Sequence, residues 1–101
     1  MTKPIFHIVT PERWDEFATE EFYEAESLKS EGFIHCSFKD QLEGVIGRYY
    51  RDAGELVILE LDPSRLGSEL VEEASTNGEI YPHIYGRIHK SAIVSIQKRK
   101  Q

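Results

Sequence analysis

The sequence contains a single cysteine, Cys36, and no long run of apolar residues. One cysteine cannot form a disulfide within the chain, and it leaves no cysteine pair to build a zinc knuckle. No segment approaches the roughly 18 uninterrupted apolar residues of a membrane-spanning helix, and residues 1–4 lack the apolar core of a signal peptide. These absences predict a cytoplasmic protein that does not contact membranes.

Positive charge is also scarce, because 12 Lys and Arg stand against 18 Asp and Glu and give a formal net charge of −6. Such a charge repels a phosphate backbone, so binding to nucleic acid is disfavoured. The basic run at residues 98–100 is interpreted as a solvated end that keeps a terminal strand in water. The pattern does not set the oligomeric state, and a monomer is favoured.

What is present indicates a folded chain. Hydrophobic residues make up 40% of the 101 residues, and the aromatic residues are spread along the sequence rather than clustered. This composition argues against disorder, and a chain of this length buries well over half of its unfolded surface. Repeats, low-complexity stretches and linkers are absent. We therefore expect residues 1–101 to form one domain.

The first half of the chain predicts two helices. Residues 5–9 form a short apolar strand, and Thr10 with Pro11 then provides an N-cap and a first helical residue. Trp14 and Phe17 share one face of that helix, which predicts core packing rather than a binding role. Residues 22–28 mix acids with aromatics and are interpreted as an irregular connection.

A second helix follows a short strand at residues 33–36. Ser37 can cap this helix, with Asp40 three residues later as a short version of the capping box. Its apolar stripe has helical spacing and ends before Gly54; it consists of Leu42, Val45, Ile46 and Tyr49.

Strands dominate the second half. Residues 56–61 are nearly all apolar, as expected of a strand covered on both faces. Residues 70–74 and 92–96 read as further strands, and residues 75–78 are a turn signal. Two early helices followed mostly by strands favour the α+β class.

In an extended segment 33–37, His35 and Ser37 point to one face, where a strand runs into a helix N-terminus. Free N–H groups at such a terminus favour a phosphate or carboxylate. The alternative is that Ser37 only caps the helix and His35 makes a structural hydrogen bond. The same alternation points Cys36 away from His35, which predicts a small buried hydrophobic residue rather than a nucleophile.

Residues 81–86 combine aromatic rings, a proline and a glycine. If this segment is extended, His83 and Tyr85 share a face, and both have polar tips on apolar bodies. The alternative is an aromatic loop packed over a sheet edge.

His7 lies on an apolar strand, where a lone histidine is more often an interior residue with its hydrogen bonds satisfied. Glu73 precedes the turn into the His83 segment and could accept hydrogen bonds from a ribose diol or fix a histidine tautomer; a solvated surface acid is the alternative. We expect His7, His35 and His83 to line one cleft. None of these residues has the local spacing of zinc ligands, so no metal is expected.

Several motifs, taken together and in order, resemble the family called domain of unknown function 952 over nearly the whole chain. They include Ile5-Phe6-His7-Ile8, Glu31-Gly32-Phe33-Ile34-His35-Cys36-Ser37 and Pro82-His83-Ile84-Tyr85-Gly86. That family is grouped by remote similarity with the ADP-ribosyltransferase-like fold. The resemblance implies a small, split, mostly antiparallel sheet that binds NAD between its halves.

The resemblance also implies roles for individual residues, with NAD or a related nucleotide as the small-molecule ligand. His7 would contact a ribose or the nicotinamide amide, and Tyr85 would stack on a ring near His83. His35, a candidate for catalysis as well as binding, would border the nicotinamide ribose and the phosphates with Ser37. Glu73 would be the catalytic acid that stabilises oxocarbenium-like charge as nicotinamide leaves.

Two other functions compete with an ADP-ribosyltransferase-like enzyme. The same histidines could hold an anionic metabolite without breaking a bond, as in a non-enzymatic metabolite-binding module. Residues 81–85 could also be a contact surface of a protein-interaction module.

Overall fold

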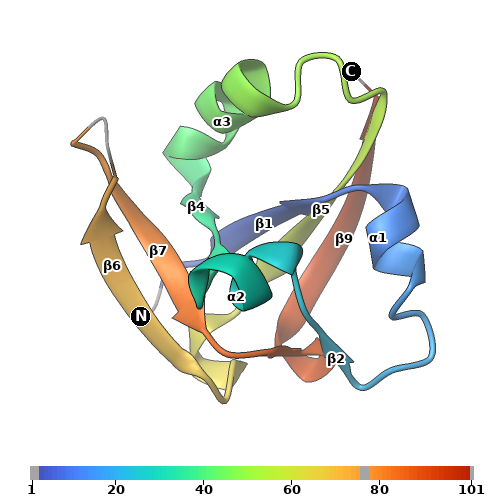
Figure 1. Ribbon diagram of the computed structural model, residues 1–101, viewed down its shortest axis with the longest axis vertical. Helices are drawn as coiled ribbons and strands as arrows, with labels where there is room; N and C mark the ends of the chain where they lie inside the picture. The colour runs from blue at the N-terminus through green and yellow to red at the C-terminus, as the bar shows by residue number, and fades with distance from the viewer. Residues whose placement is uncertain (1–2, 76–77, 101) are drawn as a thin grey trace.

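The computed structural model describes residues 3–75 and 78–100, which form a mixed α+β fold (Figure 1). The α+β class expected from the sequence is confirmed, and every strand pairing in these residues is antiparallel. The strands are β1 Ile5–Val9, β2 Phe22–Tyr23, β3 Ile34–His35, β4 Ser37–Phe38, β5 Glu55–Leu61, β6 Glu69–Ala74, β7 Ile80–Tyr85, β8 Ile88–His89 and β9 Ile93–Lys100. The α-helices are α1 Pro11–Asp15, α2 Glu26–Glu31 and α3 Leu42–Tyr49, and short 3-10 helices are η1 Lys39–Gln41, η2 Pro63–Arg65 and η3 Lys90–Ala92.

The strands form a four-stranded sheet in the order β4-β1-β5-β9, a three-stranded sheet β3-β7-β6 and a two-stranded pair β2-β8. Strand β5 lies between β1 and β9 and is buried on both faces, as its apolar run predicted. Leu56 and Ile58 face a small core with α3, whereas Val57, Leu59 and Leu61 face the larger core. In Figure 1, α3 lies at the top between the four-stranded sheet and the β6–β7 hairpin.

The chain passes from one sheet to the other at Cys36. Residues of β3 pair with β7, with His35 opposite His83, whereas Ser37 of β4 pairs with Phe6 of β1. Between them, the Cys36 N–H donates to the Pro82 carbonyl at 3.1 Å. Cys36 is 3% exposed, and burial raises the pKa of its thiol. The prediction of a small buried hydrophobic residue at Cys36 is confirmed.

Helix α1 begins where the sequence predicted, and the Arg13 N–H donates to Oγ1 of its N-cap residue Thr10 at 3.3 Å. The helix ends at Asp15, so Phe17, which was expected on the same helix, lies beyond it. Trp14 and Phe17 both pack against the larger core. The expectation of a core role for Trp14 is confirmed.

The predicted irregular connection at residues 22–28 is wrong, because it contains β2 and the start of α2. Helix α2 was missed because its N-cap residue, Ala25, has no side chain that can cap, and none of its residues is buried. Its end carries a clear signal, since Gly32 adopts a φ of 90° that a glycine accepts readily. The sequence predicted two α-helices, whereas the described residues contain three.

The predicted cap at Ser37 is also wrong. Ser37 lies in β4, and the N-cap residue of η1 is Phe38, whose N–H donates to Oε1 of Gln41 at 3.0 Å. The apolar stripe of α3 is confirmed, with Leu42 and Ile46 buried. No helix in residues 3–75 and 78–100 is both long and apolar enough to cross a membrane.

The later strands match their predictions. Strand β6 covers the predicted segment 70–74, and residues 80–85 form β7 rather than an aromatic loop. Of the predicted strand 92–96, residues 93–96 lie in β9, whereas Ala92 ends η3. Of the predicted turn at residues 75–78, residues 76 and 77 lie outside the described residues.

Candidate functional site

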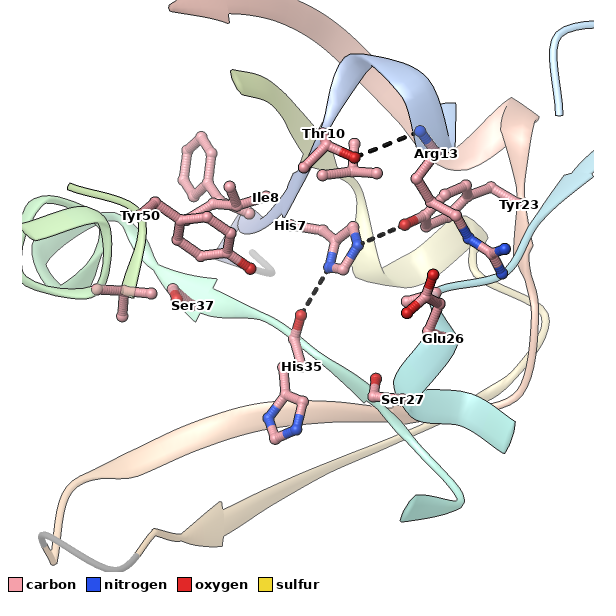
Figure 2. A pocket seen from close by; sticks show the side chains of 14 residues that line it. His7, Ile8, Thr10, Arg13, Tyr23, Glu26, Ser27, His35, Ser37 and Tyr50 are labelled. Atoms are coloured by element: carbon pink, nitrogen blue, oxygen red, sulfur yellow. Dashed lines mark hydrogen bonds between the residues drawn. The ribbon is translucent and has the colours of Figure 1, made fainter. Parts of the chain in front are cut away.

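Two adjoining hollows lie where the two larger sheets meet. The first, here called the His7 hollow, has a volume of about 340 Å³ and is lined by residues that include His7, Arg13 and Tyr23 (Figure 2). The second, the His83 hollow, has a volume of about 620 Å³ and is lined by residues that include Tyr81 and His83. The two hollows share His35, Ser37, Val45 and Tyr50.

The His7 ring is fixed by two hydrogen bonds. Its Nδ1 lies 2.7 Å from the His35 carbonyl, which can only accept, so Nδ1 carries the proton. Burial lowers the pKa of His7 to about 4, so at neutral pH Nε2 is unprotonated and accepts from the Tyr23 hydroxyl at 2.9 Å. His7 thus has both ring nitrogens bonded inside the protein, as in the alternative of an interior histidine, and its expected role in ligand binding stays a prediction.

Tyr23 is a site residue that the sequence reasoning missed. It is 1% exposed, its ring packs against Trp14 and Phe17, and its hydroxyl reaches His7. Burial raises the pKa of Tyr23, so the phenol keeps the proton that it donates. Its segment appeared irregular in the sequence, and a single tyrosine between acids carries no signal of its own.

Arg13 was missed as well, because it stands in a helix whose other face packs on the core. Its Nη2 donates to the Glu24 carbonyl and its Nη1 to Glu16, each at 2.8 Å. Its Nε is buried and has no hydrogen-bond partner among the described residues. Figure 2 shows the guanidinium beside Tyr23 and Glu26, at one end of the His7 hollow.

His35 belongs to both hollows through different atoms. Its carbonyl accepts from His7, whereas its ring is turned away from His7 (Figure 2) and lies edge-on to the His83 ring, with 5.3 Å between centroids. The side chain is 55% exposed, and Nε2 lies 3.0 Å from the Glu31 carboxylate. The backbone of His35 therefore serves the His7 hollow and its ring the His83 hollow.

His83 is buried and held on two sides. Its ring stacks on Phe33, with centroids 4.2 Å apart and planes at 20°. Its Nδ1 lies 2.8 Å from Oε1 of Glu73. Nε2 makes no hydrogen bond within the described part of the chain, so it can accept one from a ligand when the ring is neutral.

Glu73 accepts a second hydrogen bond on the same oxygen, from the Tyr85 hydroxyl at 2.5 Å. The Tyr85 and His83 hydrogen bonds hold the pKa of Glu73 below its ordinary range, and Glu73 in turn raises the pKa of Tyr85. Neither Glu73 nor Tyr85 lines either hollow. Glu73 therefore lies against His83, and Tyr85 against Glu73, outside the two hollows.

The rim of the His83 hollow carries a cation. Nη2 of Arg48 in α3 donates to the Tyr81 hydroxyl at 2.9 Å and lies 3.9 Å from the Glu79 carboxylate. Beside it, Nε2 of Gln41 donates to the Ile80 carbonyl at 2.7 Å. These contacts tie η1 and α3 to the β6–β7 hairpin and close one side of the hollow.

The one histidine-lined cleft expected from the sequence is thus two adjoining hollows. His7 lines the first, His83 the second, and His35 and Ser37 both. Ser37 is 4% exposed, so it forms part of the floor between them. The described residues contain no group of three or more His, Cys, Asp or Glu that could hold a metal ion.

Comparisons with known proteins agree with this geometry at the level of fold. The family model described as protein of unknown function (DUF952) matches residues 8–96. The crystal structure of protein CC0527 from Caulobacter crescentus is similar, with a TM-score of 0.85 and 27% identity over 95% of this chain and 85% of that one. The solution NMR structure of CC0527 gives a TM-score of 0.79 and 26% identity over 98% and 84%. No curated protein matches the chain significantly.

Proposed function

Because this chain belongs to the family described as protein of unknown function (DUF952), we propose a function from its own residues: it binds a nucleotide, with NAD as the candidate, in the His83 hollow. The volume of about 620 Å³ falls within the range of roughly 300–1,000 Å³ that is usual for small-molecule sites. The grouping of that family, by remote similarity, with the ADP-ribosyltransferase-like fold supports the choice of NAD.

The lining suits the ring-bearing end of such a ligand. Tyr49, which is 73% exposed, and Tyr81 of β7 both line the hollow, so a flat ring can pack against aromatic side chains. The free Nε2 of His83 can accept a hydrogen bond from a carboxamide or an exocyclic amine. The fixed His83 ring inside an aromatic hollow is the single observation that carries the proposal.

The diphosphate of NAD has to lie at the rim. The described lining of the His83 hollow includes no Lys or Arg, whereas Arg48 lies just outside it on the Tyr81 hydroxyl. An arginine fork there can pair with phosphate oxygens. The residues therefore fit the ring and ribose inside the hollow and the charged part at its edge.

Binding is favoured over ADP-ribosyl transfer by the position of Glu73. Its Oε1 already accepts from His83 and Tyr85, and the residue does not line the His83 hollow, so a ribose inside the hollow would not contact it. We therefore propose a metabolite-binding module as the main function and transfer, with Glu73 and His35 as the catalytic candidates, as the second.

An amide NMR titration of labelled protein with NAD, ADP-ribose and nicotinamide tests the binding proposal. We expect saturable shifts for NAD in residues 33–37, 45–50 and 81–83. His83→Ala should weaken binding about tenfold, the loss expected for one hydrogen bond and a ring contact. His89→Ala removes a histidine outside both hollows and should leave the affinity unchanged. No saturable shift at millimolar NAD would reject the proposal.

Release of nicotinamide from NAD tests the second function. If transfer occurs, Glu73→Gln should stop the release while NAD still binds, and Glu72→Gln should retain it because Glu72 is exposed on the neighbouring position of β6. A protein that binds NAD and releases no nicotinamide is a binding module.

A further inference from the structure

A third hollow, of about 320 Å³, shares no lining residue with the two histidine hollows. We propose that it binds a phosphate-type oxyanion, either free phosphate or a small phosphate monoester. It is formed by the β2–β8 pair and the segment after η2, and we call it the Arg87 hollow. Its polar and aromatic lining consists of Phe22, Arg65, Ser68, Arg87, His89 and Ser91.

The charge of this lining is the first reason. Acids outnumber bases in the whole chain, with a formal net charge of −6. Yet the described lining of the Arg87 hollow contains two arginines and a histidine and no Asp or Glu. Such a local excess of donors in an acidic protein favours an anionic ligand over a cation or a neutral one.

Arg87 is the side chain best placed to hold an anion. Its guanidinium lies over the Phe22 ring, 4.1 Å from the centroid. A guanidinium held over a ring by a cation–π contact can still donate hydrogen bonds through its N–H groups. Within residues 3–75 and 78–100, Arg87 side-chain atoms make no hydrogen bond or ion pair. The Arg87 guanidinium is thus oriented by an aromatic ring, and no acidic side chain in the described residues pairs with it.

The backbone around Arg87 is also held in place. The Ser68 hydroxyl donates to the Arg87 carbonyl at 2.8 Å. The neighbouring Gly86 approaches so closely that a Cβ there would lie 2.5 Å from the Ser68 hydroxyl oxygen. The segment after η2 is therefore locked onto the β7–β8 turn, and this fixes the base of the hollow.

His89 adds a donor whose proton can be assigned. The Ser91 N–H donates to its Nδ1 at 3.2 Å, so Nδ1 is unprotonated and the neutral ring carries its proton on Nε2. The Ser91 hydroxyl, 2.8 Å from the same Nδ1, then donates as well. The His89 ring also lies edge-on to Phe22, at 4.9 Å between centroids. His89 therefore offers an Nε2–H donor to a ligand.

Arg65 completes the set, although an acid accompanies it. Its Nε lies 3.6 Å from Asp62, and its side chain is 67% exposed. The N–H and the hydroxyl of Ser64 donate to Oδ1 of Asp62, whereas the Arg65 Nε faces Oδ2, which leaves the Nη groups of Arg65 for a ligand. Two guanidinium forks and an imidazole come from three segments, which suits the four oxygens of a tetrahedral phosphate better than the two of a carboxylate.

This site is distinct from the proposed nucleotide site. Phe22 and Tyr23 are successive residues of β2, so their side chains point to opposite faces. Tyr23 contacts His7 on one face, and Phe22 contacts His89 and Arg87 on the other. A phosphate in the Arg87 hollow would therefore be a second ligand and does not depend on NAD binding.

The test is a set of separate amide NMR titrations with inorganic phosphate, methyl phosphate and acetate. Chloride is adjusted in each to keep the ionic strength constant. We expect saturable shifts in residues 65–68 and 87–91, with a dissociation constant in the millimolar range. Tighter binding of methyl phosphate would identify a monoester ligand, and tighter binding of inorganic phosphate the free ion. Acetate binding as tightly as phosphate would overturn the assignment to a phosphate.

Variants distinguish phosphate binding in the Arg87 hollow from phosphate attraction to the general surface charge. Arg87→Ala should weaken phosphate binding about tenfold or more, as for the loss of a charged fork. Arg87→Lys keeps the charge without the fork and should also weaken it. Arg51→Ala removes one exposed charge outside the hollow and should leave binding unchanged. Equal losses in Arg51→Ala and Arg87→Ala, or shifts that do not saturate, would overturn the proposal.

Discussion

His7 and His83 are both held through Nδ1, but the two partners differ in charge. The partner of His7 is the neutral carbonyl of His35, so burial dominates and the ring stays uncharged. The partner of His83 is the Glu73 carboxylate. The first histidine therefore acts as a fixed structural link, and the second keeps a free Nε2 for a ligand.

Burial of His7 makes the protein less stable in mild acid. Its pKa is about 4 in the folded protein and 6.5 ordinarily, so between these values the unfolded chain binds a proton that the folded protein does not. The free energy of unfolding should fall by about 3 kcal/mol from pH 7 to pH 4 through this group. Urea denaturation at several pH values measures it.

His7→Gln provides the control, since it removes the titrating group. Its stability should change much less between pH 7 and pH 5, before most carboxylates titrate. An unchanged pH dependence in this variant would contradict the assignment to His7.

Glu73 should fix the tautomer of His83. In Glu73→Ala the ring loses its only hydrogen-bond partner in the described residues, and the preference for a proton on Nδ1 should disappear. Nitrogen chemical shifts of the His83 ring report this directly. Glu72→Ala, on the neighbouring position of β6, should leave them unchanged, whereas equal effects of both variants would point to a change in the hairpin itself.

The hydrogen bond between Glu73 and His83 also predicts how the stability of the protein depends on pH in acid. The pKa of Glu73 is lowered in the folded protein, so its contribution to stability is present above the ordinary carboxyl pKa and is lost as pH falls through the lowered value. Glu73→Ala should flatten this part of the stability curve below about pH 4.5. A curve identical to that of the wild-type protein would show that the pair adds no stability.

At the scale of elements, the strength of the local pattern decided what could be predicted. Strands β1 and β5 and helix α3 have apolar runs or stripes that match their burial. Helix α2 has no buried residue and no side-chain cap, so it depends on its contacts with β3 rather than on its own pattern. Tyr23 and Arg13 were missed for the same reason, since their roles arise only when β2 and α1 meet β1.

Two changes of glycine to alanine, one inside a helix and one at a helix end, should have opposite effects on the stability of the protein. Gly47 lies in α3 with open space where a Cβ would stand, so Gly47→Ala should stabilise the protein by about 0.5–1 kcal/mol. Gly32 ends α2 at a φ of 90°, so the same change there should cost about 1–2 kcal/mol. Thermal or urea unfolding of both variants measures the difference, and equal signs would contradict the helix ends described here.

At the scale of the whole molecule, the sequence could not show the change of sheet at Cys36. Strand alternation placed His35 and Ser37 on one face, and that argument assumes a single continuous strand. The structure splits the segment between two sheets, with β3 paired to β7 and β4 to β1. For this reason the structure has two adjoining hollows, which share His35 and Ser37, where the sequence predicted one cleft.

Labelling of Cys36 should report the opening of the whole fold. The thiol is 3% exposed, burial raises its pKa, and its backbone N–H is bonded to Pro82. A disulfide reagent should therefore react with Cys36 only when the protein unfolds. Urea should raise the reaction rate in proportion to the fraction of unfolded protein. Fast labelling of the native protein, at a rate independent of urea, would show that the two sheets separate locally.

The crossing at Cys36 also couples the two hollows. It joins the two larger sheets at edge strands, because β3 stands at one end of the order β3-β7-β6 and β4 at one end of the order β4-β1-β5-β9. His35 and Ser37, on either side of the crossing, line both hollows. The crossing can therefore act as a hinge, and a rotation of one sheet relative to the other should change the shape of both hollows together.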